Sequence, residues 1–176
     1  MVIKRIFTGF GNCHFVTFRC SGRRSLLSTP PMRQIVISVL GDLAGRNGTH
    51  VSGFVVMPDH VHATLWFDDD RRLPEMMKTW KRLSSHYLLI HLEQYNPAML
   101  PLLADVRNGR EIRAFWLQRY HEFNILSQDK LREKLDYLHF NPVKKGLCAA
   151  PEDWLWSSAR WYLLQKSCGV KIEPGF

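Results

Sequence analysis

The stretch that decides the fold is HVSGFVVMPDHVHATLWF, residues 50 to 67. It contains two apolar runs rich in β-branched and aromatic residues, His50 to Met57 and His60 to Phe67, separated by Pro58-Asp59. Proline lacks the N–H that a central strand must donate, and a proline followed by a polar residue is typical of a turn. The stretch therefore predicts two antiparallel strands joined as a β-hairpin.

The segments on either side of this hairpin alternate between strand and helix patterns. β-branched and aromatic residues predict strands at Asn12 to Cys20 and at Ala114 to Ile125. Apolar residues at helical spacing predict helices at Met32 to Arg46 and at Leu73 to about Gln94. The segment Asn96 to Arg113 contains two prolines and a glycine, so we expect a loop there.

A last helix follows the final predicted strand. Ser127 is a favourable N-cap for a helix from Gln128 to about Phe140, and Pro142 is expected to end it. The order β-α-β-β-α-β-α predicts an α+β fold, a ferredoxin-like antiparallel sheet with helices packed on one face, plus a C-terminal extension. A chain of 176 residues fits one core and is too short for two ordinary domains, so we expect a single domain with appendages. Tryptophans after Lys144 indicate that the end of the chain packs back on the body.

Charge and composition narrow the class of partner. The formal net charge is +8, from 24 Lys and Arg against 16 Asp and Glu, which favours a polyanion such as nucleic acid. No apolar run approaches the roughly 18 residues of a spanning helix, so a membrane is not an expected partner. The four cysteines form no CxxC pair and indicate reduced thiols in a cytoplasmic protein.

A pair of histidines lies within the predicted hairpin. His60 and His62 stand two residues apart on a strand, so their side chains leave the same face and could both reach one metal ion. Taken alone, the motif also describes two ordinary histidines on a strand surface. The metal interpretation therefore needs a second group of reactive residues.

The last helix supplies that group. On a helical wheel, Tyr137 lies beside the apolar stripe and shares a face with Lys130, Lys134 and Asn141. Without further context, Tyr137 would be a half-buried aromatic at the edge of an amphipathic helix and Asn141 a helix-end residue.

Together the two groups fit attack on a phosphodiester. A tyrosine hydroxyl can serve as nucleophile, while a metal and lysines neutralise the phosphate oxygens. The amide oxygen of Asn141 could complete the ligands of His60 and His62. Two imidazoles and an amide oxygen leave positions open for phosphate and water, so Mg²⁺ or Mn²⁺ is the expected ion.

Two longer blocks carry a resemblance to a known family. VVMPDHVHATLWF (Val55 to Phe67) and LDYLHFNPVKKGLCAAPEDWLWSS (Leu135 to Ser158) resemble the two signature blocks of the single-tyrosine HUH transposases. Within that group they are most similar to the REP-associated tyrosine transposases. The resemblance extends from Phe10 to Tyr162, with the blocks in the family's order. It implies one catalytic domain over residues 1–162 and a C-terminal tail over residues 163–176.

The resemblance implies a site and a reaction. His60 and His62 would be metal ligands, Asn141 the third ligand and Tyr137 the nucleophile of an endonuclease and strand transferase. The substrate would be single-stranded DNA carrying hairpins, cleaved to a 5′-phosphotyrosine and a free 3′-OH. The arginines after the first strand would contact a short guide sequence; they are Arg19, Arg23 and Arg24. Relatives occur as monomers and dimers, so a homodimer is one expected state.

Four alternatives remain open at this point. The chain could be a hairpin-binding protein or repressor without catalysis, or a replication initiator or relaxase with the same chemistry. It could also be a metallohydrolase that activates water, in which case Tyr137 is dispensable. Among tyrosines, Tyr120 is the nearest competitor, because His121 follows it directly.

Overall fold

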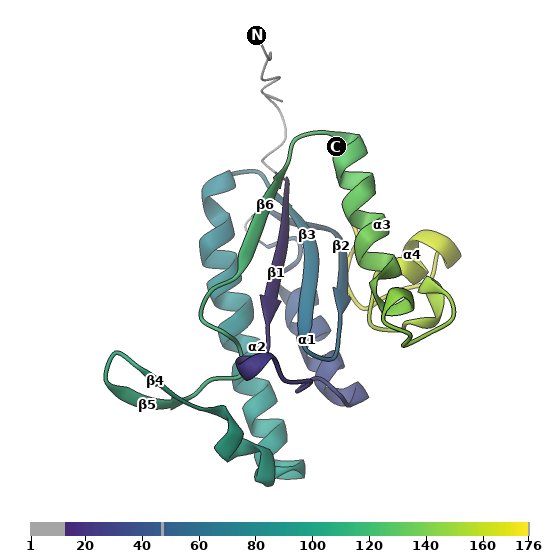
Figure 1. Cartoon of the computed structure of the whole chain (residues 1–176). Coiled ribbons are helices and arrows are strands. Elements are labelled where there is room, and N and C mark those ends of the chain that lie inside the picture. The colour runs from purple at the N-terminus through teal and green to yellow at the C-terminus, as the bar shows by residue number, and fades with distance from the viewer. Residues whose placement is uncertain (1–12, 47, 176) are drawn as a thin grey trace.

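The computed structural model describes residues 13–46 and 48–175. Four strands form one antiparallel sheet in the order β2-β3-β1-β6 (Figure 1). Their bounds are β1 (Cys13–Arg19), β2 (Thr49–Val56), β3 (His60–Phe67) and β6 (His121–Ile125). Sequence neighbours β2 and β3 pair as the predicted hairpin, and β3 lies between β2 and β1 in the split βαβ arrangement. The predicted ferredoxin-like sheet is confirmed. Asn12, the expected first residue of β1, lies outside the described residues.

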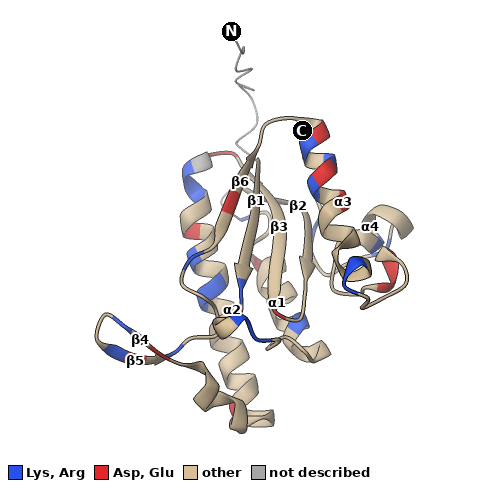
Figure 2. Cartoon of the chain, viewed as in Figure 1, with Lys and Arg blue, Asp and Glu red and all other residues tan. Residues whose placement is uncertain are grey.

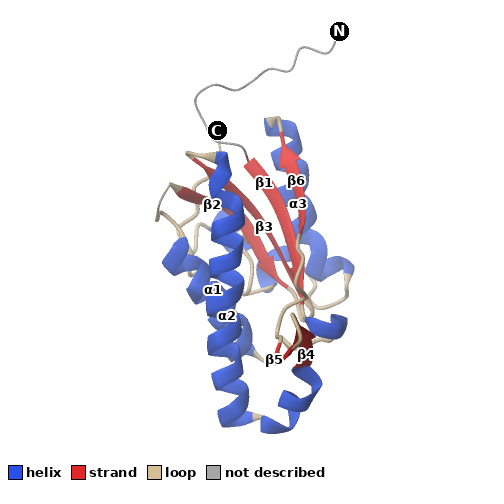
Figure 3. Ribbon diagram, turned by 90° about the vertical axis from the view of Figure 1, so that its left-hand side faces the viewer, coloured by secondary structure: helices blue, strands red, loops and turns tan. Residues whose placement is uncertain are grey.

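Helices cover both faces of the sheet. As predicted, α1 (Pro30–Leu43) and α2 (Leu73–Tyr95) pack together on one face, around the fully buried Trp80. On the other face, α3 (Gln128–Lys144) buries Leu131 and Leu138 against β2 and neighbouring strands (Figure 3). The second face thus has a helix of its own, and this helix carries the predicted nucleophile.

The segment predicted as a loop contains regular structure. A 3-10 helix (Pro97–Leu103) leads into a two-stranded arm of β4 (Ala104–Arg107) and β5 (Arg110–Arg113). The turn residues Asn108 and Gly109 have φ of 52° and 73°, the left-handed values that a two-residue hairpin turn requires. The strands have four residues each and are largely exposed, and the prolines and the glycine of the segment favoured a loop over strands.

The last sheet strand is shorter than predicted. Only His121–Ile125 pairs with β1, whereas the preceding segment from Ala114 to Tyr120 crosses toward it without forming a strand. Phe115 and Trp116 are both buried, and Trp116 forms an isolated bridge with Cys20, just past the end of β1. The aromatic run thus fills the core beside the end of β1 and is not part of the ladder of β6.

The helix α3 begins as predicted but ends later. The Ser127 hydroxyl accepts the Lys130 backbone N–H at 3.2 Å, which confirms the N-cap. The prediction that Pro142 ends the helix near Phe140 is wrong, because α3 continues to Lys144. Proline has no N–H to donate to the preceding turn, but the chain still closes a final turn through the Lys145 N–H to the Asn141 carbonyl at 3.1 Å.

The C-terminal segment packs on the body, as expected from its tryptophans. It runs along the outer edge of β2, where the Ser158 N–H donates to the Phe54 carbonyl at 2.9 Å and the Glu173 N–H to the Val51 carbonyl at 2.9 Å. The remaining helices are the short α4 (Ala159–Leu164) and 3-10 turns at Ser21–Arg23, Asp70–Arg72 and Pro151–Asp153. Within residues 13–46 and 48–175, no helix combines the length and apolarity needed to cross a membrane.

Candidate active site

The two histidines lie on the face of the sheet that α3 flanks. His60 and His62 are the first and third residues of β3, and both are buried, with 5% and 4% of their surface exposed. Their ring centroids are 4.6 Å apart. The i, i+2 spacing thus places two imidazoles side by side, as predicted.

Each histidine is held through one ring nitrogen. Nδ1 of His60 lies 2.6 Å from the Asp59 carboxylate, and Nδ1 of His62 lies 2.7 Å from the Thr17 hydroxyl. Neither Nε2 atom has a hydrogen-bond partner in the described part of the chain. Metal-binding histidines are usually oriented in this way, with the second nitrogen bonded to a carboxylate or hydroxyl. The arrangement leaves both Nε2 atoms available for a ligand in the cleft.

Both imidazoles are neutral at neutral pH. Burial lowers the pKa of His60, although its hydrogen bond to Asp59 acts in the opposite direction. Burial, followed by electrostatic interaction with His60 and with the charge of Arg19, lowers the pKa of His62 to about 3. Neutral imidazole is the form that binds a metal ion.

Tyr137 reaches the same cleft from α3. Its side chain is 43% exposed, and its ring centroid lies 5.4 Å from that of His62. The ammonium groups of Lys134 and Lys144 lie 5.9 Å and 5.7 Å from the tyrosine ring. The sequence predicted the first of these lysines. The second was missed because the helix was expected to end before it.

Asn141 lies one turn after the tyrosine on α3. The residue is 6% exposed, and within the described chain no hydrogen bond involves its side-chain amide. Among the described residues no group of three or more His, Cys, Asp or Glu could hold a metal ion, so the third protein ligand would have to be of another type. The amide oxygen of Asn141 is suited to that role.

One open cleft of about 590 Å³ is lined by His60, His62, Tyr137, Asn141 and Lys144. Its wall also contains Ser25, Pro58, Lys145 and Leu147. Figure 2 shows Lys and Arg at the end of β1 and toward the end of α3, the two segments that border the cleft. A basic cleft with a half-exposed tyrosine fits a phosphodiester substrate.

The predicted DNA-binding residues fall in three places. Arg19 lines the cleft and lies 3.6 Å from the Asp59 carboxylate. Arg23 and Arg24 are exposed on the following turn, outside that lining, and Arg24 donates to the Leu102 carbonyl at 2.9 Å. Lys130 lies in the first turn of α3, seven residues before Tyr137, where its ammonium bonds Glu133 at 2.6 Å.

The fold and this cleft define a class of protein, a transposase-like protein with a ferredoxin-like sheet. Residues 11–101 match the family described as Transposase IS200 like, and the chain belongs to this family. The match includes the strand with the two histidines and ends before Tyr137. The family predicted from the sequence blocks is confirmed.

Individual relatives agree with this assignment. The chain is 24% identical to the REP-associated tyrosine transposase of Escherichia coli K12 over 153 residues, 84% of this chain and 76% of that protein. The chain is 27% identical to a protein of Haemophilus influenzae assigned to the same group. This match covers 58% of the present chain and 54% of the relative, so the chain spans about half the length of that relative. A REP-associated tyrosine transposase bound to a REP hairpin has the same fold, with a TM-score of 0.63 at 21% identity over 100% of this chain and 94% of that one.

Proposed function

We propose that this protein is a metal-dependent endonuclease and strand transferase for single-stranded DNA that carries hairpins. The observation that carries the proposal is the Tyr137 ring 5.4 Å from the His62 ring, in the cleft that also contains His60 and Asn141. A nucleophile, two neutral imidazoles and several cations converge there from elements far apart in sequence. Few structural roles need this combination.

The proposed step is an attack by the tyrosine on a phosphodiester. The Tyr137 hydroxyl oxygen bonds to phosphorus, the bond from phosphorus to the 3′ oxygen breaks, and the phenol proton passes to solvent. The departing 3′ oxygen takes a proton from water, which leaves a free 3′-OH and a 5′-phosphotyrosine bond. Attack of a 3′-OH on that bond reverses the step and joins strands. Lys134 and Lys144, on either side of the tyrosine, stabilise the negative charge that develops.

A divalent ion fits the residues of the cleft. His60 and His62 offer unpaired Nε2 atoms, their Nδ1 atoms are anchored, and the Asn141 amide is unpaired within the described chain. Mg²⁺ or Mn²⁺ held by these three side chains would neutralise charge on the scissile phosphate. The set leaves room for phosphate and water, unlike a closed structural zinc site.

The hairpin part of the proposal rests on the relatives. The solved relative is bound to a REP hairpin, and two protein relatives carry the REP-associated name. The net charge of +8 of the present chain further supports a nucleic acid as partner. We propose the same kind of DNA as substrate here, with the chain acting as a monomer or a homodimer.

Covalent trapping tests the proposed nucleophile. The protein is incubated with Mn²⁺ and single-stranded DNA that carries hairpins with single-stranded flanks, and adducts are resolved on a denaturing gel and mapped by mass spectrometry. We expect an adduct on the peptide containing Tyr137, its loss in Tyr137→Phe, and its loss with a chelator. Tyr120→Phe is the matched control, because Tyr120 lies outside the cleft and should leave the adduct intact.

The same experiment separates the alternatives. Hairpin binding without any adduct would favour a non-catalytic binding protein. Metal-dependent cleavage that persists in Tyr137→Phe would favour hydrolysis by water, and an adduct on another peptide would overturn the assignment of the nucleophile.

A further inference from the structure

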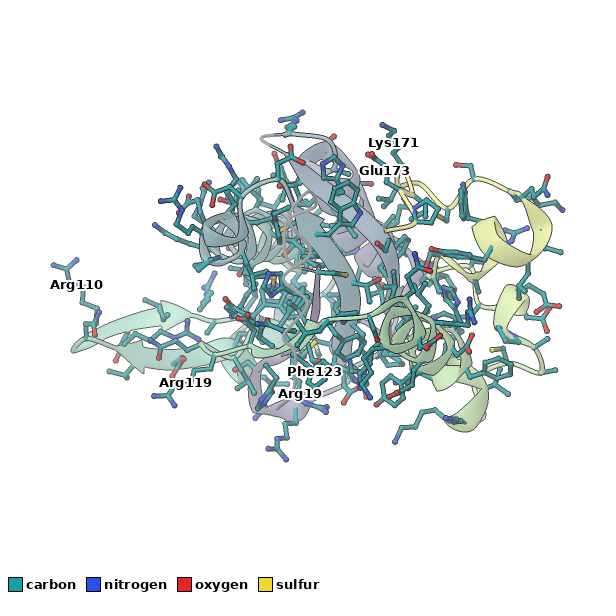
Figure 4. All side chains as sticks on the ribbon, turned by 90° about the horizontal axis from the view of Figure 1, so that it is seen from above. Arg19, Arg110, Arg119, Phe123, Lys171 and Glu173 are labelled. Atoms are coloured by element: carbon teal, nitrogen blue, oxygen red, sulfur yellow. The ribbon has the colours of Figure 1, made fainter. Side chains whose placement is uncertain are left out.

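Phe123 is an exposed aromatic side chain that the proposed reaction does not use. It lies in β6, the edge strand of the sheet, and 45% of its surface is exposed. Its partner across the sheet is Phe15, so both rings leave the face that carries the histidines. Figure 4, which looks down on the molecule from above, shows Phe123 on the same side as Arg19, a residue of the cleft.

Phe15 and Lys134 link Phe123 to the tyrosine. Phe15, opposite Phe123, stacks on His62 with centroids 5.2 Å apart and contacts Tyr137 at 5.9 Å. The ammonium of Lys134 lies 5.0 Å from the Phe123 ring and 5.9 Å from the Tyr137 ring. Because one ammonium group reaches both rings, neighbouring nucleotides of a single strand could occupy both positions.

Positive charge surrounds the exposed ring. Lys130 and Lys134 place their ammonium groups 5.6 Å and 5.0 Å from its centroid. One carboxylate, Glu133, pairs with both lysines, at 2.6 Å and 3.7 Å, so the surroundings keep a net positive charge. An apolar protein partner over this ring would have to desolvate those ammonium groups, whereas a nucleotide offers a base for the ring and a phosphate for the lysines.

We propose that Phe123 is a stacking platform for a nucleobase beside the cleaved phosphodiester, with Lys130 and Lys134 holding the adjoining phosphates. The inference rests on the proposed function, since it assumes single-stranded DNA in the cleft. It assigns a role to the exposed part of the edge strand β6. Stacking of this kind tolerates any base, so Phe123 contributes affinity and position rather than sequence choice.

The test compares two strands that differ only in their bases. Fluorescently labelled oligo(dT) and an abasic strand of equal length have the same phosphates, and both are titrated by anisotropy in EDTA, so that no cleavage occurs. The wild type should bind oligo(dT) more tightly than the abasic strand. Phe123→Ala should weaken oligo(dT) binding by about 5-fold to 100-fold and leave abasic binding unchanged.

Two further variants complete the design. Phe123→Trp should retain the preference for bases, because it keeps an aromatic face. Leu126→Ala is the matched control, since Leu126 is 62% exposed just after β6 and should behave as wild type. Equal loss on both strands in Phe123→Ala, or an unchanged preference for bases, would overturn the inference. Failure of the proposed function would appear separately, as the absence of a covalent adduct with Mn²⁺.

Discussion

Replacing Thr17 with valine tests whether the cleft is built to hold a metal ion. The Thr17 hydroxyl lies 2.7 Å from Nδ1 of His62, and both side chains are buried. Valine keeps the branched shape that suits β1 but removes the hydrogen-bond partner, which costs about 1–3 kcal/mol for an unsatisfied buried group. His62 then loses the contact that fixes its ring orientation and its tautomer.

The expected effect is a loss of metal affinity. Removing a partner that orients a metal-binding histidine typically lowers metal affinity or activity by about 10-fold to 100-fold. We therefore expect the Mn²⁺ concentration for half-maximal adduct formation to rise by about that factor in Thr17→Val. Titration calorimetry with Mn²⁺ alone should show the same shift, independently of catalysis.

Thr64→Val is the matched control for this prediction. Thr64 is fully buried two residues after His62 on β3, and its hydroxyl donates to the Gly53 carbonyl at 3.3 Å rather than to a histidine. Both variants should lose a similar amount of stability, but only Thr17→Val should lose Mn²⁺ affinity. Equal Mn²⁺ affinity in the two variants would refute the idea that Thr17 orients a ligand.

Three further predictions concern the helix that carries the tyrosine, the pH dependence of stability and the DNA contact. A Cβ at Gly53 would meet the Leu135 side chain of α3, so Gly53→Ala should displace α3 and destabilise the protein by about 1–3 kcal/mol. It should also reduce adduct formation more than Thr64→Val does. An unchanged melting temperature and unchanged adduct formation would contradict this prediction. Burial lowers the pKa of His139 to about 4 and that of His62 to about 3. Below about pH 6.5 the unfolded state therefore binds protons at these histidines that the folded state does not. The free energy of unfolding should fall as the pH drops from about 6.5 to 4.5. In urea titrations, the free energy of unfolding should decrease by up to about 1.4 kcal/mol per pH unit for each histidine. A free energy of unfolding that does not change with pH would show that these rings are accessible to protons. Affinity for oligo(dT) should fall with salt at a logarithmic slope near −0.7 per neutralised phosphate, and a flat response would argue against a phosphate contact.

Several parts of the site could be predicted because they depend on local geometry. The two-residue period of a strand places His60 and His62 on one face whatever the rest of the chain does. The helical period likewise places Tyr137, Lys134 and Asn141 on one side of α3. The prediction of where α3 ends was wrong, because a rule for single residues, that proline ends a helix, did not hold in the folded chain. The helix α3 continues past Pro142 to Lys144, and this places a second lysine beside the tyrosine.

The residues that the sequence did not predict come from pairing between distant segments. Thr17 meets His62 because β1 and β3 pair in one register, and Phe123 faces Phe15 because β6 pairs with β1. Neither pairing follows from spacing along the chain, since a slip of one residue would send every side chain to the other face. The short arm of β4 and β5 was not predicted, because its strands have only four residues each and lie in a segment with two prolines and a glycine.

The sequence by itself determined the order of the strands of the main sheet and of the three long helices, the histidine face of β3, the capped start of α3 and, through two long blocks, the family. Only the tertiary structure decided that α3 lies on the face opposite α1 and α2 and brings Tyr137 to His62. The physical reason is that the periodicity of the sequence fixes which side of a helix or strand is apolar. Which of two apolar sheet faces a helix covers depends instead on the packing of the whole core. In this chain both faces of the sheet are apolar, and the second one is completed by α3.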